Sequence, residues 1–307
     1  MAAVVGVHGI AQQYKGPHHL ASTWLPSLQD GVHFAGGELT ADDFAMAFYG
    51  NLFRQPRTPS AGVPGLTAAD LDDGDTELLE LCWREAARID PAVPAPADAT
   101  MARTPRAVQR ALNALSQSSF FSGIGERTLV GVLKQVQLYF NNPHVRARAL
   151  RSLEDAVTGD TRVLIGHSLG SVVAYEALSA HPEWRVHTLV TLGSPLGISK
   201  IVFDRLNPVP VGGRGSFPGS VVAWVNMAAP GDVVALVKRL ADRFDGAVTD
   251  LLVDNGAKAH DASPYLTTVE VGQAVLRGLG STGSPVLSSS SPADGRGATI
   301  PASAKGT

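Results

Sequence analysis

A serine with a glycine two residues away on either side stands near the middle of the chain. In the segment IGHSLGS, Ser168 lies between Gly166 and Gly170, after the apolar run 162–165 and before a helical pattern. The G-x-S-x-G arrangement between a strand and a helix holds a serine hydroxyl above a sheet, and glycine avoids the clashes of so tight a turn. The pattern predicts that Ser168 is a nucleophile. A glycine-rich turn or phosphate site is the alternative.

A serine hydroxyl needs a neighbouring base, and the base needs a carboxylate to orient it. In G-x-S-x-G hydrolases the acid and then the histidine follow the serine along the chain. The histidines after Ser168 are His181, His187 and His260. His181 ends the following helix and His187 begins the next strand, so both are expected at the opposite end of the sheet. His260, in a loop before the last helix, is the predicted base, and a solvent-exposed loop histidine is the alternative.

The orienting carboxylate is expected in a loop after a strand, between the serine and the histidine. Asp232 fits this position, because it follows the apolar run 221–226 and a Pro-Gly turn. Its alternative role is that of an N-cap for a helix predicted over 233–244. The competing carboxylates are Asp204, Asp250 and Asp254.

Two backbone N–H groups are expected to stabilise the oxyanion that forms when the serine attacks a carbonyl. One belongs to Leu169, at the N-terminus of the helix after the serine. The other is assigned to Ile10, in the loop VHGIAQQ that follows the first predicted strand. The residues expected to line the substrate site around these groups are His8, Gly9, His167, Pro195 and Leu196.

Apolar runs alternate with helical patterns along most of the chain, which predicts a mostly parallel sheet with helices on both faces. The predicted strands are 4–7, 44–50, 162–165, 186–195 and 221–226, with a short edge strand at 249–254. The predicted helices are 18–37, 142–157, 169–180, 233–244 and 264–279.

The alternation is interrupted by a block without strand patterns. We expect one domain over residues 1–279 with a helical, lid-like insertion at about 66–142, followed by a flexible Ser/Gly/Pro/Ala tail at 280–307. Most apolar residues of the second half of the insertion should pack helix on helix, and some should line the entrance of an acyl pocket. These residues are Phe120, Phe121, Ile124, Leu129, Val130, Leu133, Tyr139 and Phe140.

Composition excludes several classes of protein. The chain has 307 residues, of which 44% are hydrophobic and 17% charged, and its net charge of −3 comes without a long basic run. These values favour a globular protein and argue against a dedicated nucleic-acid binder. The single cysteine, Cys82, permits no internal disulfide and is expected to be a buried apolar residue. No apolar stretch reaches the length of a membrane span, and a cytoplasmic location is the expectation.

Five segments together resemble the α/β-hydrolase superfamily, and within it the bacterial serine esterases and lipases: VHGI, IGHSLGS, TLGSPLG, WVNMAAPGD and AHDASPYL. The resemblance implies an α/β-hydrolase fold with Ser168, Asp232 and His260 as the catalytic triad, and it implies no cofactor. No metal site is expected. The helical block is longer than a minimal lid, so the resemblance does not extend to a substrate class.

The predicted activity is hydrolysis of a small carboxylic ester or thioester through an acyl-enzyme at Ser168. An acyltransferase or a cyclising thioesterase would use the same three residues, and so would a peptidase or amidase. A non-catalytic binding module built on the same fold is the alternative from another class. No nucleic-acid partner and no stable membrane anchor are expected.

Overall fold

The structure is a computed structural model that describes residues 2–54, 66–96, 104–118, 126–256 and 259–280. Its centre is a six-stranded, entirely parallel sheet in the order β2-β1-β3-β4-β5-β6, which confirms the predicted α/β class. The strands are β1 (Val4–Val7), β2 (Phe44–Ala47), β3 (Val163–His167), β4 (Thr188–Leu192), β5 (Ala223–Ala228) and β6 (Val248–Leu252).

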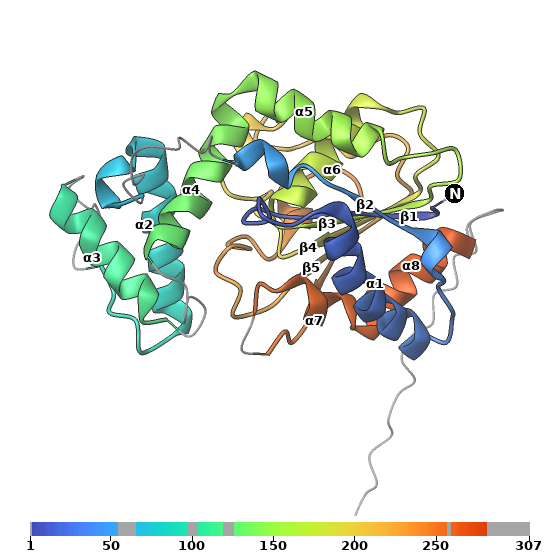
Figure 1. The fold of residues 1–307 in the computed structure, drawn as a ribbon, viewed down its shortest axis with the longest axis horizontal. Coiled ribbons are helices and arrows are strands. Elements are labelled where there is room, and N and C mark those ends of the chain that lie inside the picture. Colours follow the sequence, from blue (N-terminus) through green and yellow to red (C-terminus); the bar gives the residue numbers. More distant parts are fainter. Residues whose placement is uncertain (1, 55–65, 97–103, 119–125, 257–258, 281–307) are drawn as a thin grey trace, which may run out of the picture.

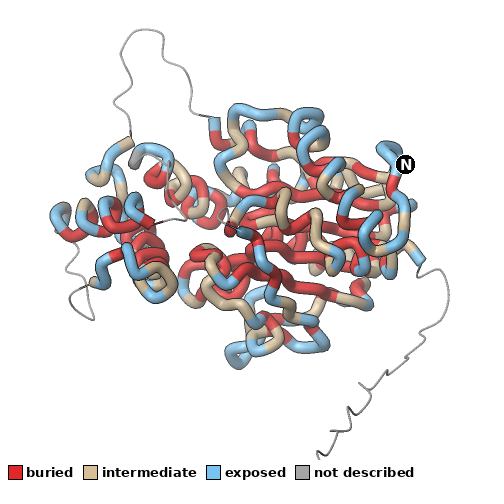
Figure 2. The backbone as a smooth tube through the Cα atoms, turned by 90° about the horizontal axis from the view of Figure 1, so that it is seen from below, coloured by how far each residue is buried: buried red, intermediate tan, exposed pale blue. Residues whose placement is uncertain are grey.

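Helices cover both faces of the sheet, because neighbouring strand residues point to opposite sides and both sides are apolar. One face carries α1 (Pro17–Phe34), α7 (Ala262–Leu266) and α8 (Val269–Gly280), and the other carries α5 (Pro143–Glu154) and α6 (Leu169–Ala180) (Figure 1). In β3, Val163 and Ile165 pack with the first group while Leu164 packs with the second. The strands are buried along most of their length (Figure 2).

The strand order changes direction between β1 and β3. From β1 the chain first adds β2 on one side and later adds β3 to β6 on the other. In open parallel sheets, ligands bind outside the carboxyl ends of the strands at such a switch point. The loops that follow β1 and β3 meet there, and the loop after β3 contains Ser168.

The segment between β2 and α5 contains helices and no strand among its described residues. It comprises α2 (Asp73–Ile89), α3 (Pro105–Ser116) and α4 (Glu126–Asn141), which pack against one another beside the sheet (Figure 1). Of the apolar residues predicted to pack there, Leu129, Val130, Leu133, Tyr139 and Phe140 are buried. Phe120, Phe121 and Ile124 lie outside the described residues, as does the predicted tail from residue 281 onward.

A buried carboxylate on α6 ties the helical segment to the sheet domain. Glu176 accepts a hydrogen bond of 2.6 Å from the Tyr139 hydroxyl of α4 and forms an ion pair with Arg146 of α5. It also accepts the N–H of Asn207 from the loop after β4. Because a buried charge is tolerated only when it is paired and hydrogen-bonded, this cluster fixes the position of α4 over the carboxyl edge of the sheet.

The prediction of a helix over 233–244 is wrong. The segment is irregular apart from a single 3-10 turn, Leu240–Asp242. Side chains from β5 and β6 form hydrogen bonds with backbone groups that would otherwise pair within a helix. Asn226 donates to the Lys238 carbonyl, and the Asp250 carboxylate accepts the N–H groups of Leu240 and Ala241. These tertiary bonds outweigh the helical preference of the sequence.

The helix predicted over 264–279 divides into α7 and α8. Thr268 begins the second helix, because its hydroxyl accepts the N–H of Val271 and its carbonyl accepts the N–H of Gly272. The division lets the chain turn sharply after the loop that contains His260.

Candidate active site

Ser168 occupies a strained backbone position between β3 and α6. Its φ of 53° and ψ of −128° fall in a region that residues with side chains rarely adopt. Its N–H donates a 3.0 Å hydrogen bond to the Leu192 carbonyl of β4. Such strain costs on the order of 1–3 kcal/mol and persists only where the surroundings enforce it.

The two glycines flanking Ser168 are required by close backbone contacts. A β-carbon on Gly170 would fall 2.1 Å from the Val7 carbonyl oxygen, and one on Gly166 would fall 2.6 Å from the Ser171 α-carbon. No side chain fits at either position, so the G-x-S-x-G spacing follows from the approach of α6 to β1 and β3.

Two further serines stabilise the turn between β3 and α6 by hydrogen bonding. The Ser171 hydroxyl donates a 2.6 Å hydrogen bond to the Ser168 carbonyl and lies 2.7 Å from the Ser194 hydroxyl. Ser194 in turn accepts the N–H of Leu196 at 3.2 Å. All three hydroxyl-bearing residues are buried, so the turn after β3 and the loop after β4 are held together at their bases.

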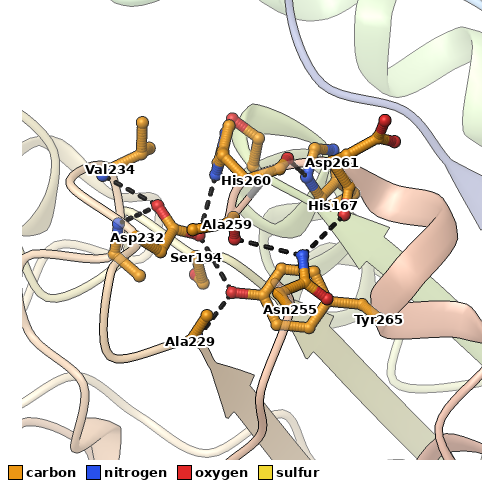
Figure 3. A network of polar contacts seen from close by, with 12 residues as sticks. His167, Ser194, Ala229, Asp232, Val234, Asn255, Ala259, His260, Asp261 and Tyr265 are labelled. Atoms are coloured by element: carbon orange, nitrogen blue, oxygen red, sulfur yellow. Dashed lines mark hydrogen bonds and ion pairs between the residues drawn. The ribbon is translucent and has the colours of Figure 1, made fainter. Parts of the chain in front are cut away.

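The structure brings Asp232 and His260 together. The His260 ring Nδ1 lies 2.9 Å from Oδ2 of Asp232, and the Asp232 side chain is fully buried while that of His260 is 21% exposed (Figure 3). The other carboxylate oxygen, Oδ1, accepts the N–H groups of Val234 and Ala235. Burial alone would raise the pKa of the Asp232 carboxyl, but the His260 ring and the donated hydrogen bonds outweigh it and lower the pKa. Asp232 is therefore an ionised carboxylate at neutral pH.

Ser168 is linked to this pair through two consecutive residues at the end of β4. Its N–H is bonded to Leu192, and the next residue, Gly193, touches both partners: a β-carbon there would fall 2.6 Å from the Asp232 carboxylate and 2.9 Å from the His260 ring. The ring of His167 lies 4.7 Å from that of His260. The hydroxyl-, imidazole- and carboxylate-bearing residues predicted from the sequence thus gather at the carboxyl ends of β3, β4 and β5.

The competing residues lie elsewhere or have other partners. Asp204 accepts the N–H of Lys200, Asp254 that of Gly256, and Asp250 binds the segment after Asp232. His181, at the end of α6, contacts Glu154 and Glu183. His187 immediately precedes β4, at the opposite end of the sheet from Ser168.

The loop that carries His260 is held by two residues that sequence reasoning did not single out. The Tyr265 hydroxyl donates to Asp232 Oδ2 at 3.0 Å and accepts the N–H of Ala229 at 2.6 Å. The Asn255 amide donates to the carbonyls of Ala259 and Asp261, on either side of His260 (Figure 3). Tyr265 belongs to the segment AHDASPYL, and Asn255 lies shortly before it. Neither residue has a spacing pattern that would predict its hydrogen-bond partner.

His167 supports the backbone at His260 and does not line the cavity around Ser168, contrary to the sequence prediction. Burial and the neighbouring His260 lower the pKa of the His167 ring to about 3, so the ring is neutral near pH 7. Its Nε2 lies 2.8 Å from the His260 carbonyl and donates to it (Figure 3). The residue before the serine therefore fixes the backbone that carries His260.

The loop after β1 lies directly against Ser168. A β-carbon on Gly9 would fall 2.7 Å from Cβ of Ser168 and 3.3 Å from its hydroxyl oxygen. The N–H of Ala11, a residue with φ 61°, donates to the Gln135 side chain of α4 at 2.9 Å. Ile10 thus sits between a residue packed on the serine and one anchored to the helical segment, in the position predicted for an oxyanion donor.

His8 lies behind this loop. It is 1% exposed and stacks on Tyr49, and its Nε2 accepts the N–H of Tyr49 while its Nδ1 lies 2.6 Å from the Gly9 carbonyl. Nδ1 must carry the proton, because Nε2 faces a donor. His8 shapes the loop and does not face the cavity beside Ser168.

We predict that His8 makes folding sensitive to acid. Burial lowers the pKa of its ring from 6.5 to about 4, so the unfolded chain binds a proton more readily than the folded protein. Stability from this residue is present above pH 6.5 and is lost as the pH falls toward 4. The difference in unfolding free energy between wild type and His8→Gln should narrow by about 3 kcal/mol between about pH 7 and pH 4. Denaturant titrations at the two pH values measure it, and a difference that stays constant between them would contradict the prediction.

A second prediction concerns Tyr265. Tyr265→Phe removes one hydrogen-bond donor from the Asp232 carboxylate, which then interacts more strongly with the protonated His260 ring. In a pH–rate profile of the predicted ester hydrolysis, the acid limb should therefore move to higher pH by up to about one unit. The Ala229 N–H also loses its acceptor, which should lower stability by about 1–3 kcal/mol. An unchanged profile together with lower stability would show that Tyr265 is purely structural.

An enclosed cavity of about 60 Å³ adjoins Ser168. Apart from the serine, its lining is almost wholly apolar, and α2 and α4 form one side of it. Ser168 itself is 3% exposed, so it lies beneath these helices. The sheet domain contributes Ile10, Ser168, Leu169, Pro195, Ile198, Val202 and Val234, and the helices contribute Leu78, Cys82, Leu129, Val132, Leu133 and Val136.

The remaining sequence predictions can now be placed. Ile10, Leu169 and Pro195 line the cavity, as do Leu129 and Leu133 of the insertion. Leu196, in the loop after β4, is buried but does not line the cavity. Cys82 is buried as predicted, and burial raises the pKa of its thiol to about 12; its place beside the cavity was not anticipated.

Comparisons with known proteins add no assignment: no protein family and no curated protein matches the sequence. Among the described residues, no group of three or more His, Cys, Asp or Glu side chains is arranged to hold a metal ion, and no helix is both long and apolar enough to cross a membrane.

Proposed function

We propose that the protein is an α/β-hydrolase that cleaves small carboxylic esters or thioesters through an acyl-enzyme at Ser168. The observation that carries the proposal is the gathering of Ser168 with the buried Asp232–His260 pair at the switch point of a parallel sheet. A surface histidine or a simple helix cap would not require a buried carboxylate with four donors around it.

In this proposal His260 takes the proton of Ser168 as the hydroxyl oxygen attacks the acyl carbon. Asp232 holds the ring with its Nδ1 protonated and stabilises the imidazolium that forms. The N–H groups of Ile10 and Leu169 stabilise the oxyanion; Leu169 is the first residue of α6, where N–H groups have no intrahelical partner. His260 then protonates the leaving group, and water attacks the acyl-enzyme in the reverse sequence.

The cavity predicts the size of the acyl group. Its volume of about 60 Å³ is well below the range of about 300–1,000 Å³ typical of drug-sized ligands. A hollow this small and apolar suits a short acyl chain, of on the order of two to four carbons.

We therefore expect kcat/KM for p-nitrophenyl esters to peak at acetyl to butyryl and to fall by about tenfold or more at octanoyl. Leu133→Ala enlarges the cavity from the α4 side and should move the optimum to longer chains. An exposed substitution elsewhere in the helical segment, Arg110→Ala on α3, is the matched control and should leave the optimum unchanged. A wild-type preference for octanoyl would contradict the assignment of this cavity.

An acyltransferase would differ only in the nucleophile that resolves the acyl-enzyme. The enclosed serine is compatible with this second candidate, since restricted access can exclude water. Product analysis with water alone and with added alcohols or amines separates the two.

A fluorophosphonate probe tests the proposed function directly. The folded protein should gain one adduct, mapped by peptide mass spectrometry to Ser168, and Ser168→Ala should gain none. Labelling that is absent from folded wild-type protein would overturn the enzymatic assignment and favour a binding module.

A further inference from the structure

A second and larger hollow lies on the other side of the loop after β1. It has a volume of about 490 Å³, within the range of ligand-binding pockets. We call it the outer groove: it runs between residues 11–14, the 3-10 turn Gly50–Phe53 with Arg54, and the outer side of α4. None of the residues of the proposed reaction lines it.

The outer groove and the acyl cavity are neighbours that share part of their walls. Val132 of α4 lines both hollows, and of two consecutive loop residues Ile10 lines the cavity while Ala11 lines the groove. An acyl carbonyl bound at the Ile10 N–H would lie close to this shared wall. With the acyl chain in the cavity, the neighbouring groove offers a larger space for the leaving group.

The lining of the groove is positively charged. Arg54, Arg127 and Lys134 border it, and none of its described lining residues is a carboxylate. Lys134 is paired with Asp75 and Asp72 of the helical segment, so its charge is largely balanced. Arg54 donates its Nε–H to the Gln13 carbonyl, which keeps the guanidinium at the groove, and no described carboxylate pairs with Arg54 or Arg127. The groove is therefore bordered by two arginines without a described carboxylate partner, in a chain whose net charge is −3.

From the position and charge of the outer groove we infer that it binds the leaving-group part of the substrate and that this part is anionic, an acid-bearing alcohol or thiol. The inference rests on the proposed function for the identity of the leaving group. Guanidinium groups suit phosphate and carboxylate oxygens, and two exposed contacts of this kind are worth about tenfold in affinity together.

Two thioesters with the same acyl group and the same reacting sulfur test the inference. Butyryl coenzyme A carries phosphates on its leaving group, whereas butyryl N-acetylcysteamine is its neutral, truncated counterpart. Isothermal calorimetry on Ser168→Ala protein measures binding of both without turnover. At about 20 mM salt we expect the anionic thioester to bind about tenfold more tightly, and less so at about 200 mM salt because screening weakens the contacts.

The Arg54→Ala/Arg127→Ala double variant, in the same background, should reduce this preference to about threefold or less. Arg148→Ala, an exposed arginine of α5 outside the groove, is the matched control and should retain the preference. Equal affinities for the two thioesters, or a preference that survives the double variant, would overturn the inference. If the wild-type protein binds the anionic thioester more tightly but the fluorophosphonate does not label Ser168, the anion site stands and only the proposed hydrolysis is wrong.

Discussion

Ser168→Ala is expected to lower kcat for a short-chain ester by about six orders of magnitude, because the proposed acyl-enzyme route loses its nucleophile. The residual rate should still exceed that of the uncatalysed reaction, because the N–H groups of Ile10 and Leu169 and the cavity remain. The fold should be retained, since alanine is smaller than serine and the Ser168 side chain makes no capping bond to α6. Steady-state kinetics with acetyl and butyryl esters measure the loss.

Two companion variants make this prediction specific. Ser22→Ala changes an exposed serine of α1 and should retain full activity. Ser168→Gly should be as inactive as Ser168→Ala but more stable by about 1 kcal/mol, because glycine adopts the φ of 53° without strain. Activity retained in Ser168→Ala would remove the serine from the chemistry, whereas equal stability of the two variants would contradict only the strain at this turn.

The parallel sheet and the neighbourhood of Ser168 could be predicted from the sequence because both depend on local patterns. Glycines 166 and 170 are demanded by backbone contacts that any such turn makes, and short apolar runs separated by helices leave few alternatives to a parallel sheet. The pairing of Asp232 with His260 was predictable only through chain order, since 28 residues separate them.

The parts that could not be predicted depend on contacts between distant segments. Asn226 and Asp250 prevent a helix after Asp232 by binding its backbone, and nothing in the local sequence of 233–244 signals this. Gln135 of α4 reaches the loop after β1 through hydrogen bonds with Ala11 and Gln13, and Tyr265 reaches Asp232 through its hydroxyl. Such bonds have no periodicity, so they become visible only when the elements are assembled.

Asp232→Asn should reduce kcat by about four orders of magnitude while the fold persists. The orientation of the new amide is dictated by the structure: the N–H groups of Val234 and Ala235 both donate to the inner oxygen of residue 232, so that position must remain an oxygen. The amide NH₂ must therefore face His260 Nδ1. A donor there forces the ring proton onto Nε2, the nitrogen that has to accept the proton of Ser168.

Asp232→Asn also disturbs Tyr265. Its hydroxyl donates to the outer carboxylate oxygen in the wild type, and in the variant it meets an NH₂ group that cannot accept that hydrogen bond. The control is Asp204→Asn, which changes an exposed carboxylate whose partner is the Lys200 N–H and should keep activity near that of wild type. Circular dichroism and the fluorophosphonate labelling rate separate lost chemistry from lost structure: we expect a folded Asp232→Asn protein that labels orders of magnitude more slowly. A folded variant that labels at the wild-type rate would show that Ser168 draws its reactivity from another group, and the role assigned to the Asp232–His260 pair would be wrong.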